Sequence, residues 1–144
     1  MKLKKKLYKY RTNLSMIAGC IIILVTTLFF VGEKNVPYVL GDEFGYWTSA
    51  AYFFGYDWSA SINGYFSFGY GLLLAPLFLL KDSVLMYRAA IVMNALFLTG
   101  SFILAYIAGL KLFPKIRSEI IVLLAFAASV YPSYLGYVQT NMSE

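Results

Sequence analysis

The stretch Gly41-Asp42-Glu43-Phe44-Gly45-Tyr46-Trp47 places two adjacent carboxylates between strongly apolar segments. Asp42 is a favourable helix N-cap, and the apolar residues after it recur at helical spacing, which predicts a short amphipathic helix over residues 43–54. Asp42 and Tyr46 then lie one turn apart on the same face. Because ionisable groups near a bilayer are costly, the acidic pair is a candidate functional site. The alternative is an N-cap with a solvated neighbour at the membrane surface.

The composition is that of a membrane protein. Of 144 residues, 60% are hydrophobic and only 13% are charged. The net charge of +5 does not indicate a nucleic-acid partner, because half of the basic residues precede the first apolar run, where they set topology. With no histidine and with Cys20 as the single cysteine, a zinc site and an intrachain disulfide are excluded. Those basic residues are Lys2, Lys4, Lys5, Lys6, Lys9 and Arg11.

Three apolar runs are predicted to cross the membrane as helices. They cover residues 14–31, 84–110 and 118–138. A hydrocarbon core of about 30 Å requires roughly 20 apolar residues in a helix. The first run is long for a secretory signal and lacks a small-x-small cleavage site, which indicates a retained anchor. A fourth apolar piece, residues 66–80, contains Pro76 and is too short to span, so it is predicted to be re-entrant or interfacial.

Charge predicts the topology. The basic segments 1–13 and 111–117 are both expected in the cytoplasm, so two crossings separate them. Residues 32–83 then form an external loop that carries the acidic motif, and residues 139–144 begin a second external loop. The predicted fold is an all-α, multi-pass protein of the cell membrane with a cytoplasmic N-terminus. It has three transmembrane helices and an external loop with a short amphipathic helix.

The order of motifs along the chain resembles a known family. An anchor helix precedes Asp42-Glu43-x-x-Tyr46, followed by Gly55-Tyr56-Asp57-Trp58-Ser59 and by Phe68-Gly-Tyr-Gly-Leu-Leu-Leu-Ala-Pro-Leu77. A second span with an early arginine, Arg88, comes next. Over residues 14–144 this arrangement is similar to the N-terminal part of GT-C glycosyltransferases. It is most similar to the branch of protein O-mannosyltransferases and lipid A aminoarabinose transferases.

The resemblance implies a reaction and site residues. Sugar would pass from a polyprenyl-phosphate donor to an external acceptor hydroxyl with inversion. Asp42 matches the first-loop aspartate at the reaction centre and would act as general base. Glu43 would orient Asp42, or would hold a divalent cation (Mg²⁺ or Mn²⁺) together with Glu144, an acid at the position of the second external loop. No metal ligand set follows from the sequence.

Three further residues are substrate-binding candidates under the same resemblance. Arg88 would neutralise the leaving phosphate, with anchoring of a helix end at the headgroups as the alternative. Tyr46 and Trp47, beside the carboxylates, would stack on a sugar or guide the polyprenyl tail. The remaining external aromatic residues are expected to form the interfacial belt.

The chain departs from the family in its length. Such enzymes have eight or more spans, whereas three are predicted here, so the chain is expected to be a truncated product that is inactive alone. A second hypothesis is a small non-catalytic accessory subunit with a membrane-protein partner in lipid-linked sugar handling. A small transporter is a third hypothesis, and it requires polar residues in mid-span, of which there are almost none.

Overall fold

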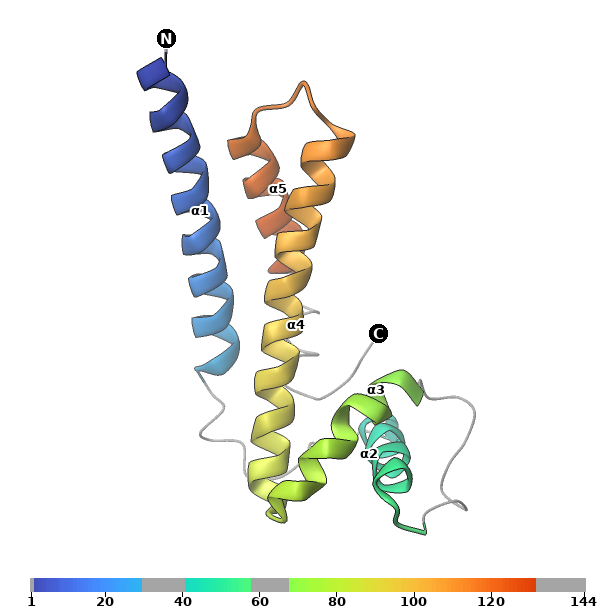
Figure 1. Ribbon diagram of the computed structural model, residues 1–144. Helices are drawn as coiled ribbons and strands as arrows, with labels where there is room; N and C mark the ends of the chain where they lie inside the picture. The colour runs from blue at the N-terminus through green and yellow to red at the C-terminus, as the bar shows by residue number, and fades with distance from the viewer. Residues whose placement is uncertain (1, 30–40, 58–67, 132–144) are drawn as a thin grey trace. The chain divides into compact units, whose positions relative to one another are not determined.

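The computed structural model describes residues 2–29, 41–57 and 68–131, and all regular elements in these ranges are helical (Figure 1). The predicted all-α class is confirmed for this part of the chain. Side chains are described from Arg11 onward in the first helix and from Glu43 onward in the second. The elements are α1 (Lys2–Leu28), α2 (Gly41–Phe54), α3 (Phe68–Leu74), the 3-10 helix η3 (Ala75–Leu80), α4 (Ser83–Leu112) and α5 (Ser118–Ser129).

Two helices are long and apolar enough to cross a membrane. They are the Arg11–Leu28 part of α1 and the whole of α4. At 1.5 Å per residue, the 18 residues of the first measure about 27 Å and the 30 residues of the second about 45 Å. These two segments overlap the first two predicted spans, residues 14–31 and 84–110. Length and composition therefore make both helices candidates for crossing a bilayer.

The third predicted span, residues 118–138, is helical only in its first part. Helix α5 has 12 residues, about 18 Å, and ends at Ser129. Val130 has left the helical conformation, with φ −92° and ψ 17°, and Pro132 in the sequence disfavours helix at the residue before it. Residues 132–138 lie outside the described part. A third crossing remains a prediction.

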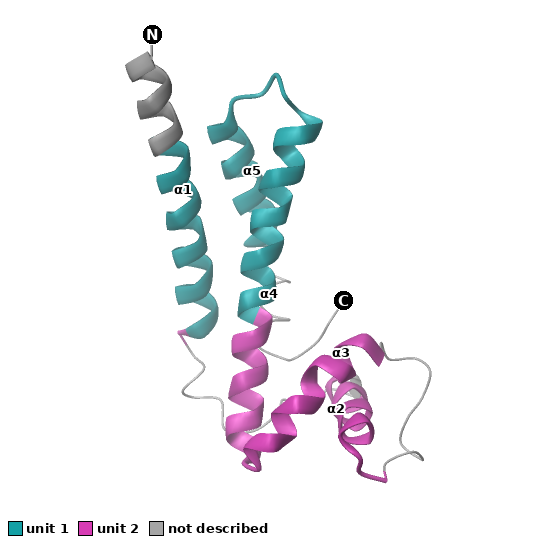
Figure 2. Cartoon of the chain, viewed as in Figure 1, with its two compact units in different colours: residues 1–28, 95–135 teal, residues 29–94, 136–144 magenta. Residues whose placement is uncertain are grey.

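The chain divides into two compact units (Figure 2). Unit 1 comprises Met1–Leu28 and Ala95–Leu135, and unit 2 comprises Phe29–Asn94 and Gly136–Glu144. Helix α4 contributes its first 12 residues to unit 2 and the rest to unit 1.

Unit 1 is held together by close helix contacts. Its core contains Ile23 of α1, Phe102 of α4, and Val122 and Ala125 of α5. A Cβ on Gly109 would lie 2.5 Å from Cγ2 of Ile121, so α4 and α5 approach closely only because Gly109 has no side chain. Small residues at such crossings are typical of helices that pack in lipid.

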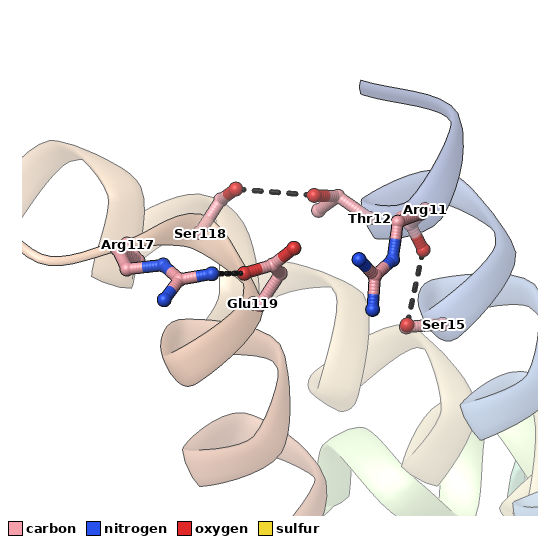
Figure 3. Close-up of polar contacts among 6 residues, drawn as sticks. All are labelled: Arg11, Thr12, Ser15, Arg117, Ser118 and Glu119. Atoms are coloured by element: carbon pink, nitrogen blue, oxygen red, sulfur yellow. Dashed lines mark hydrogen bonds and ion pairs between the residues drawn. The ribbon is translucent and has the colours of Figure 1, made fainter. Parts of the chain in front are cut away.

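One end of unit 1 brings the two basic segments together (Figure 3). The hydroxyls of Thr12 in α1 and Ser118 in α5 are 3.2 Å apart. Beside them Arg117 forms an ion pair with Glu119. The basic N-terminal segment and the basic 111–117 connection therefore lie at the same end of unit 1. This is the arrangement that their shared charge predicts, although the compartment they face stays a prediction.

Unit 2 packs α2 on the α3–η3 segment. Its core contains Tyr46, Ala50, Tyr70, Leu74 and Ala90. Gly71 allows the two helices to meet, because a Cβ there would lie 2.7 Å from Cβ of Ser49 and 3.2 Å from the backbone nitrogen of Ala50.

A tight turn joins this packing to α4. The helical path tightens to 3-10 geometry at Ala75, with Pro76 in its first turn, and ends at Leu80. Lys81 then adopts a left-handed conformation with φ 57°, which reverses the chain. Asp82 caps α4, since its Oδ1 accepts a hydrogen bond of 2.8 Å from the Leu85 backbone N–H. The segment predicted at 66–80 is thus helical from Phe68 to Leu80 and directly adjoins α4.

Candidate functional site

The acidic pair lies in the first turn of α2. The helix begins at Gly41, so Asp42 is its second residue. The sequence predicted Asp42 as the N-cap, which would precede the first helical residue. Carboxylates in a first turn interact favourably with the positive end of the helix dipole. The side chain of Asp42 is outside the described part of the chain, and its predicted role as general base remains a prediction.

The side chain of Glu43 is buried. It is only 1% exposed, and both of its carboxylate oxygens are shielded from solvent. Burying a carboxylate is expensive unless the group is paired and hydrogen-bonded, so an ionisable residue retained near a membrane is a candidate functional residue. The negative charge of Glu43 contributes to a raised pKa of Tyr70 in α3, so the two side chains are close enough to interact electrostatically.

Tyr70 connects α2, α3 and α4. Its ring meets Tyr46 edge-to-face, with centroids 5.2 Å apart and planes at 87°. Its hydroxyl donates a hydrogen bond of 2.8 Å to Oδ1 of Asn94 in α4. Burial raises the pKa of Tyr70 to about 12, and the negative charge of Glu43 adds to this. Tyr70 is therefore a neutral hydrogen-bond donor at physiological pH.

Other polar side chains of unit 2 are also buried. Thr48 and Ser49 both donate hydrogen bonds to the Gly45 carbonyl, at 2.9 and 3.0 Å. This back-bonding satisfies hydroxyls inside a helix without water. We call Glu43, Thr48, Ser49, Tyr70 and Asn94 the buried polar set.

Trp47 belongs to an aromatic cluster around Phe78. The ring centroids of Trp47, Phe54 and Tyr56 lie 5.9, 5.5 and 5.6 Å from that of Phe78. The indole Nε1 of Trp47 is buried and has no hydrogen-bond partner among the described residues. Trp47 is thus half-buried and held by Phe78, and Tyr46 is buried against Tyr70, so neither ring lies open on the surface as a stacking platform.

Two predicted site residues come from outside α2. Arg88 is half-buried in the second turn of α4, within unit 2. Glu144 lies outside the described residues. Among the described side chains, no three acids or thiols gather into a metal-binding group. The side chains of Asp42 and Glu144 are not among those described.

Sequence reasoning missed Tyr70 and Asn94. Asn94 carried a usable signal, because it is an amide inside a 30-residue apolar helix and is 92% buried. Polar residues in such helices usually face other protein groups. Tyr70 carried no such signal, since it is one of 13 tyrosines.

No protein-family model, curated protein or solved structure matches this chain.

Proposed function

We propose that the chain is the N-terminal membrane module of a GT-C-type glycosyltransferase that takes a sugar from a polyprenyl-phosphate donor. The observation that carries the proposal is the burial of Glu43, 1% exposed, in a helix turn that also contains Asp42. The same unit contains the start of α4, which is long and apolar enough to span a bilayer. Retaining a buried carboxylate there is costly, which favours a functional role.

The proposed reaction is an inverting displacement at the anomeric carbon. The Asp42 carboxylate accepts the proton of the acceptor hydroxyl, and the acceptor oxygen forms a bond to the anomeric carbon. The bond between that carbon and the phosphate oxygen breaks, and the polyprenyl phosphate leaves with the electron pair. Arg88 neutralises the charge that develops on the leaving phosphate.

Glu43 serves as a positioning residue in this scheme. Its burial beside Tyr70 fixes the first turn of α2, and hence the backbone that carries Asp42. In this scheme the buried Glu43 carboxylate does not contact substrate. It holds the helix turn rigid, and the rigid turn presents the neighbouring Asp42 to substrate. This preorganisation is what a general base requires.

The membrane placement proposed here is a multi-pass one with a cytoplasmic N-terminus. The hydrogen bond between Thr12 and Ser118 supports it, because it holds both basic segments at one end of unit 1. Positive charge flanking membrane helices is retained on the cytoplasmic side. The acidic turn of α2 would then belong to the opposite side.

A transfer assay in native membranes tests the proposal. Asp42→Asn and Glu43→Gln are introduced at the chromosomal locus, and membranes are given a radiolabelled polyprenyl-phosphate sugar. Loss of a general base lowers rates by about 10²–10⁴-fold, so Asp42→Asn should abolish the transfer that depends on this gene. Glu43→Gln should lower it less.

Asp57→Asn is the matched control, because Asp57 is an exposed acid just beyond α2. It should leave transfer unchanged. If inactivating the gene removes transfer while Asp42→Asn preserves it, the chain acts as an accessory subunit and the catalytic proposal is wrong.

A further inference from the structure

We propose that α2 and the α3–η3 segment form a re-entrant helix pair whose exposed face contacts lipid acyl chains. The pair lies beside the first half of α4, in the leaflet that holds the Ser83 end of that helix. This inference does not depend on glycosyl transfer. Residues 66–80 were predicted to be re-entrant or interfacial, and the proposal selects the re-entrant alternative. It also adds α2 to the re-entrant element.

The depth of the pair follows from one hydrogen bond. Asn94 is 11 residues beyond Ser83, about 16 Å along α4. Tyr70 reaches it at 2.8 Å, yet Leu80, at the other end of the same helical segment, is only three residues from Ser83. The segment therefore inclines back along the first part of α4 and does not extend away from it at a right angle. A helix lying flat at the start of α4 would not bring Tyr70 to Asn94.

Helix α2 follows α3 to this depth. Ser49 and Ala50 touch Gly71, and Tyr46 packs its ring against Tyr70. Because the contact at Gly71 leaves no room for a side chain, the two helices form one packed element. In Figure 2, α2 and α3 lie together beside the part of α4 that belongs to the same unit.

The polarity of this element is the reverse of that of a water-facing helix pair. The buried polar set points inward, whereas the large exposed side chains among those that the structure describes in the two helices are apolar or aromatic. The α3–η3 segment contains no charged residue, and the only charged side chain described in α2, Glu43, is buried. The exposed residues are Phe44, Tyr52, Phe53, Phe54, Phe68, Leu72, Leu73, Leu79 and Leu80.

Acyl chains are the occupant that fits this face. Its described side chains carry no charge for an aqueous partner, and unit 2 also contains Leu85 and Val92, which are exposed on the membrane-spanning candidate α4. The apolar face stops at Lys81 and Asp82, both exposed and charged, where the chain would return to the headgroups. Helices satisfy their own backbone hydrogen bonds, so a packed helical pair is permitted at this depth.

Spin-label depth measurements on the full chain in phospholipid vesicles test the inference. Single cysteines are placed at exposed positions in a Cys20→Ser background: Leu73→Cys and Leu79→Cys in the pair, with Val92→Cys in α4 and Lys81→Cys as references. Relative accessibility to oxygen and to a water-soluble nickel chelate reports depth. Leu73 should match Val92, Lys81 should be accessible to nickel, and Leu79 should fall between Leu73 and Lys81.

The gradient distinguishes the alternatives. A segment lying flat on the surface gives the same depth at Leu73 and Leu79, and this result would overturn the inference. Nickel accessibility at Leu73 equal to that at Lys81 would also overturn it. All four positions are exposed in the fold, so the labels do not disturb packing. Neither outcome bears on the transfer assay, so the two proposals fail separately.

Discussion

The hydroxyl of Tyr70 donates a 2.8 Å hydrogen bond to Oδ1 of Asn94, joining the short helix α3 to α4 across 24 positions of sequence. Both side chains are buried, at 7% and 8% exposure. A hydrogen bond in such surroundings specifies one arrangement of the helices, because separating the partners leaves polar atoms without water.

Tyr70→Phe should lower the free energy of unfolding by about 1–2 kcal/mol, since it removes the donor and keeps the ring. Denaturant unfolding in detergent measures this loss. Tyr52→Phe is the matched control, because Tyr52 is a half-exposed tyrosine on α2, and it should change stability by less than about 0.5 kcal/mol. Equal effects of the two substitutions would show that the Asn94 hydrogen bond contributes nothing.

Alkaline pH should destabilise the wild-type chain through the same tyrosine. The pKa of Tyr70 is raised from 10.0 to about 12, so between these values the folded state holds a proton that the unfolded state has released. Stability is therefore full below pH 10 and falls as pH rises toward 12, by up to about 3 kcal/mol. Because Tyr70→Phe cannot ionise, its stability should fall less steeply over this range. Parallel pH curves for the two proteins would contradict the assignment.

Gly71→Ala should separate α2 from α3. The new Cβ would lie 2.7 Å from Cβ of Ser49, and the nearby Ala50 backbone cannot give way, so we expect a loss of about 1–3 kcal/mol. Gly100→Ala is the control, because a Cβ there meets nothing within 4 Å and alanine favours helix. It should be neutral or mildly stabilising. Thermal unfolding in detergent compares the two, and a tolerated Gly71→Ala would argue against the close contact.

Gly109 and Ile121 should be energetically coupled. Gly109→Ala places a Cβ 2.5 Å from Cγ2 of Ile121, whereas Ile121→Ala removes that methyl group and leaves a cavity. The double variant should cost less than the sum of the two single changes, because the new methyl occupies vacated space. A double-mutant cycle measures the difference. Strict additivity would mean that α4 and α5 do not meet at these residues.

The long helices were predictable from the sequence because local composition determines them. The apolar run of residues 84–110 corresponds closely to α4, Ser83–Leu112, and the helix predicted at 43–54 begins two residues earlier, at Gly41. Helix α1 extends back to Lys2 because lysine is a good helix former, although only its Arg11–Leu28 part is apolar. The end of α5 at Ser129 was missed, although Pro132 indicated a stop.

The candidate site was predictable only in part, because its contacts join distant segments. The acidic turn stood out from its residue types, but the burial of Glu43 depends on how α2 packs, which local patterns do not determine. The pairing of Tyr70 with Asn94 likewise requires the reversal at Lys81 and the close approach at Gly71. The ring of Tyr46 packs against Tyr70, which local patterns also do not reveal, and its substrate contact stays a prediction.

The proposed function requires that a polyprenyl-phosphate sugar binds at the acidic turn of α2. Photocrosslinking with a donor that carries a diazirine on its sugar, using the full chain in vesicles, tests this most directly. We predict that crosslinks map to residues 41–47 by peptide mass spectrometry and are suppressed by excess unlabelled donor, but not by the same polyprenol without phosphate. Crosslinks confined to other segments, or equally suppressed by the phosphate-free lipid, would contradict the account.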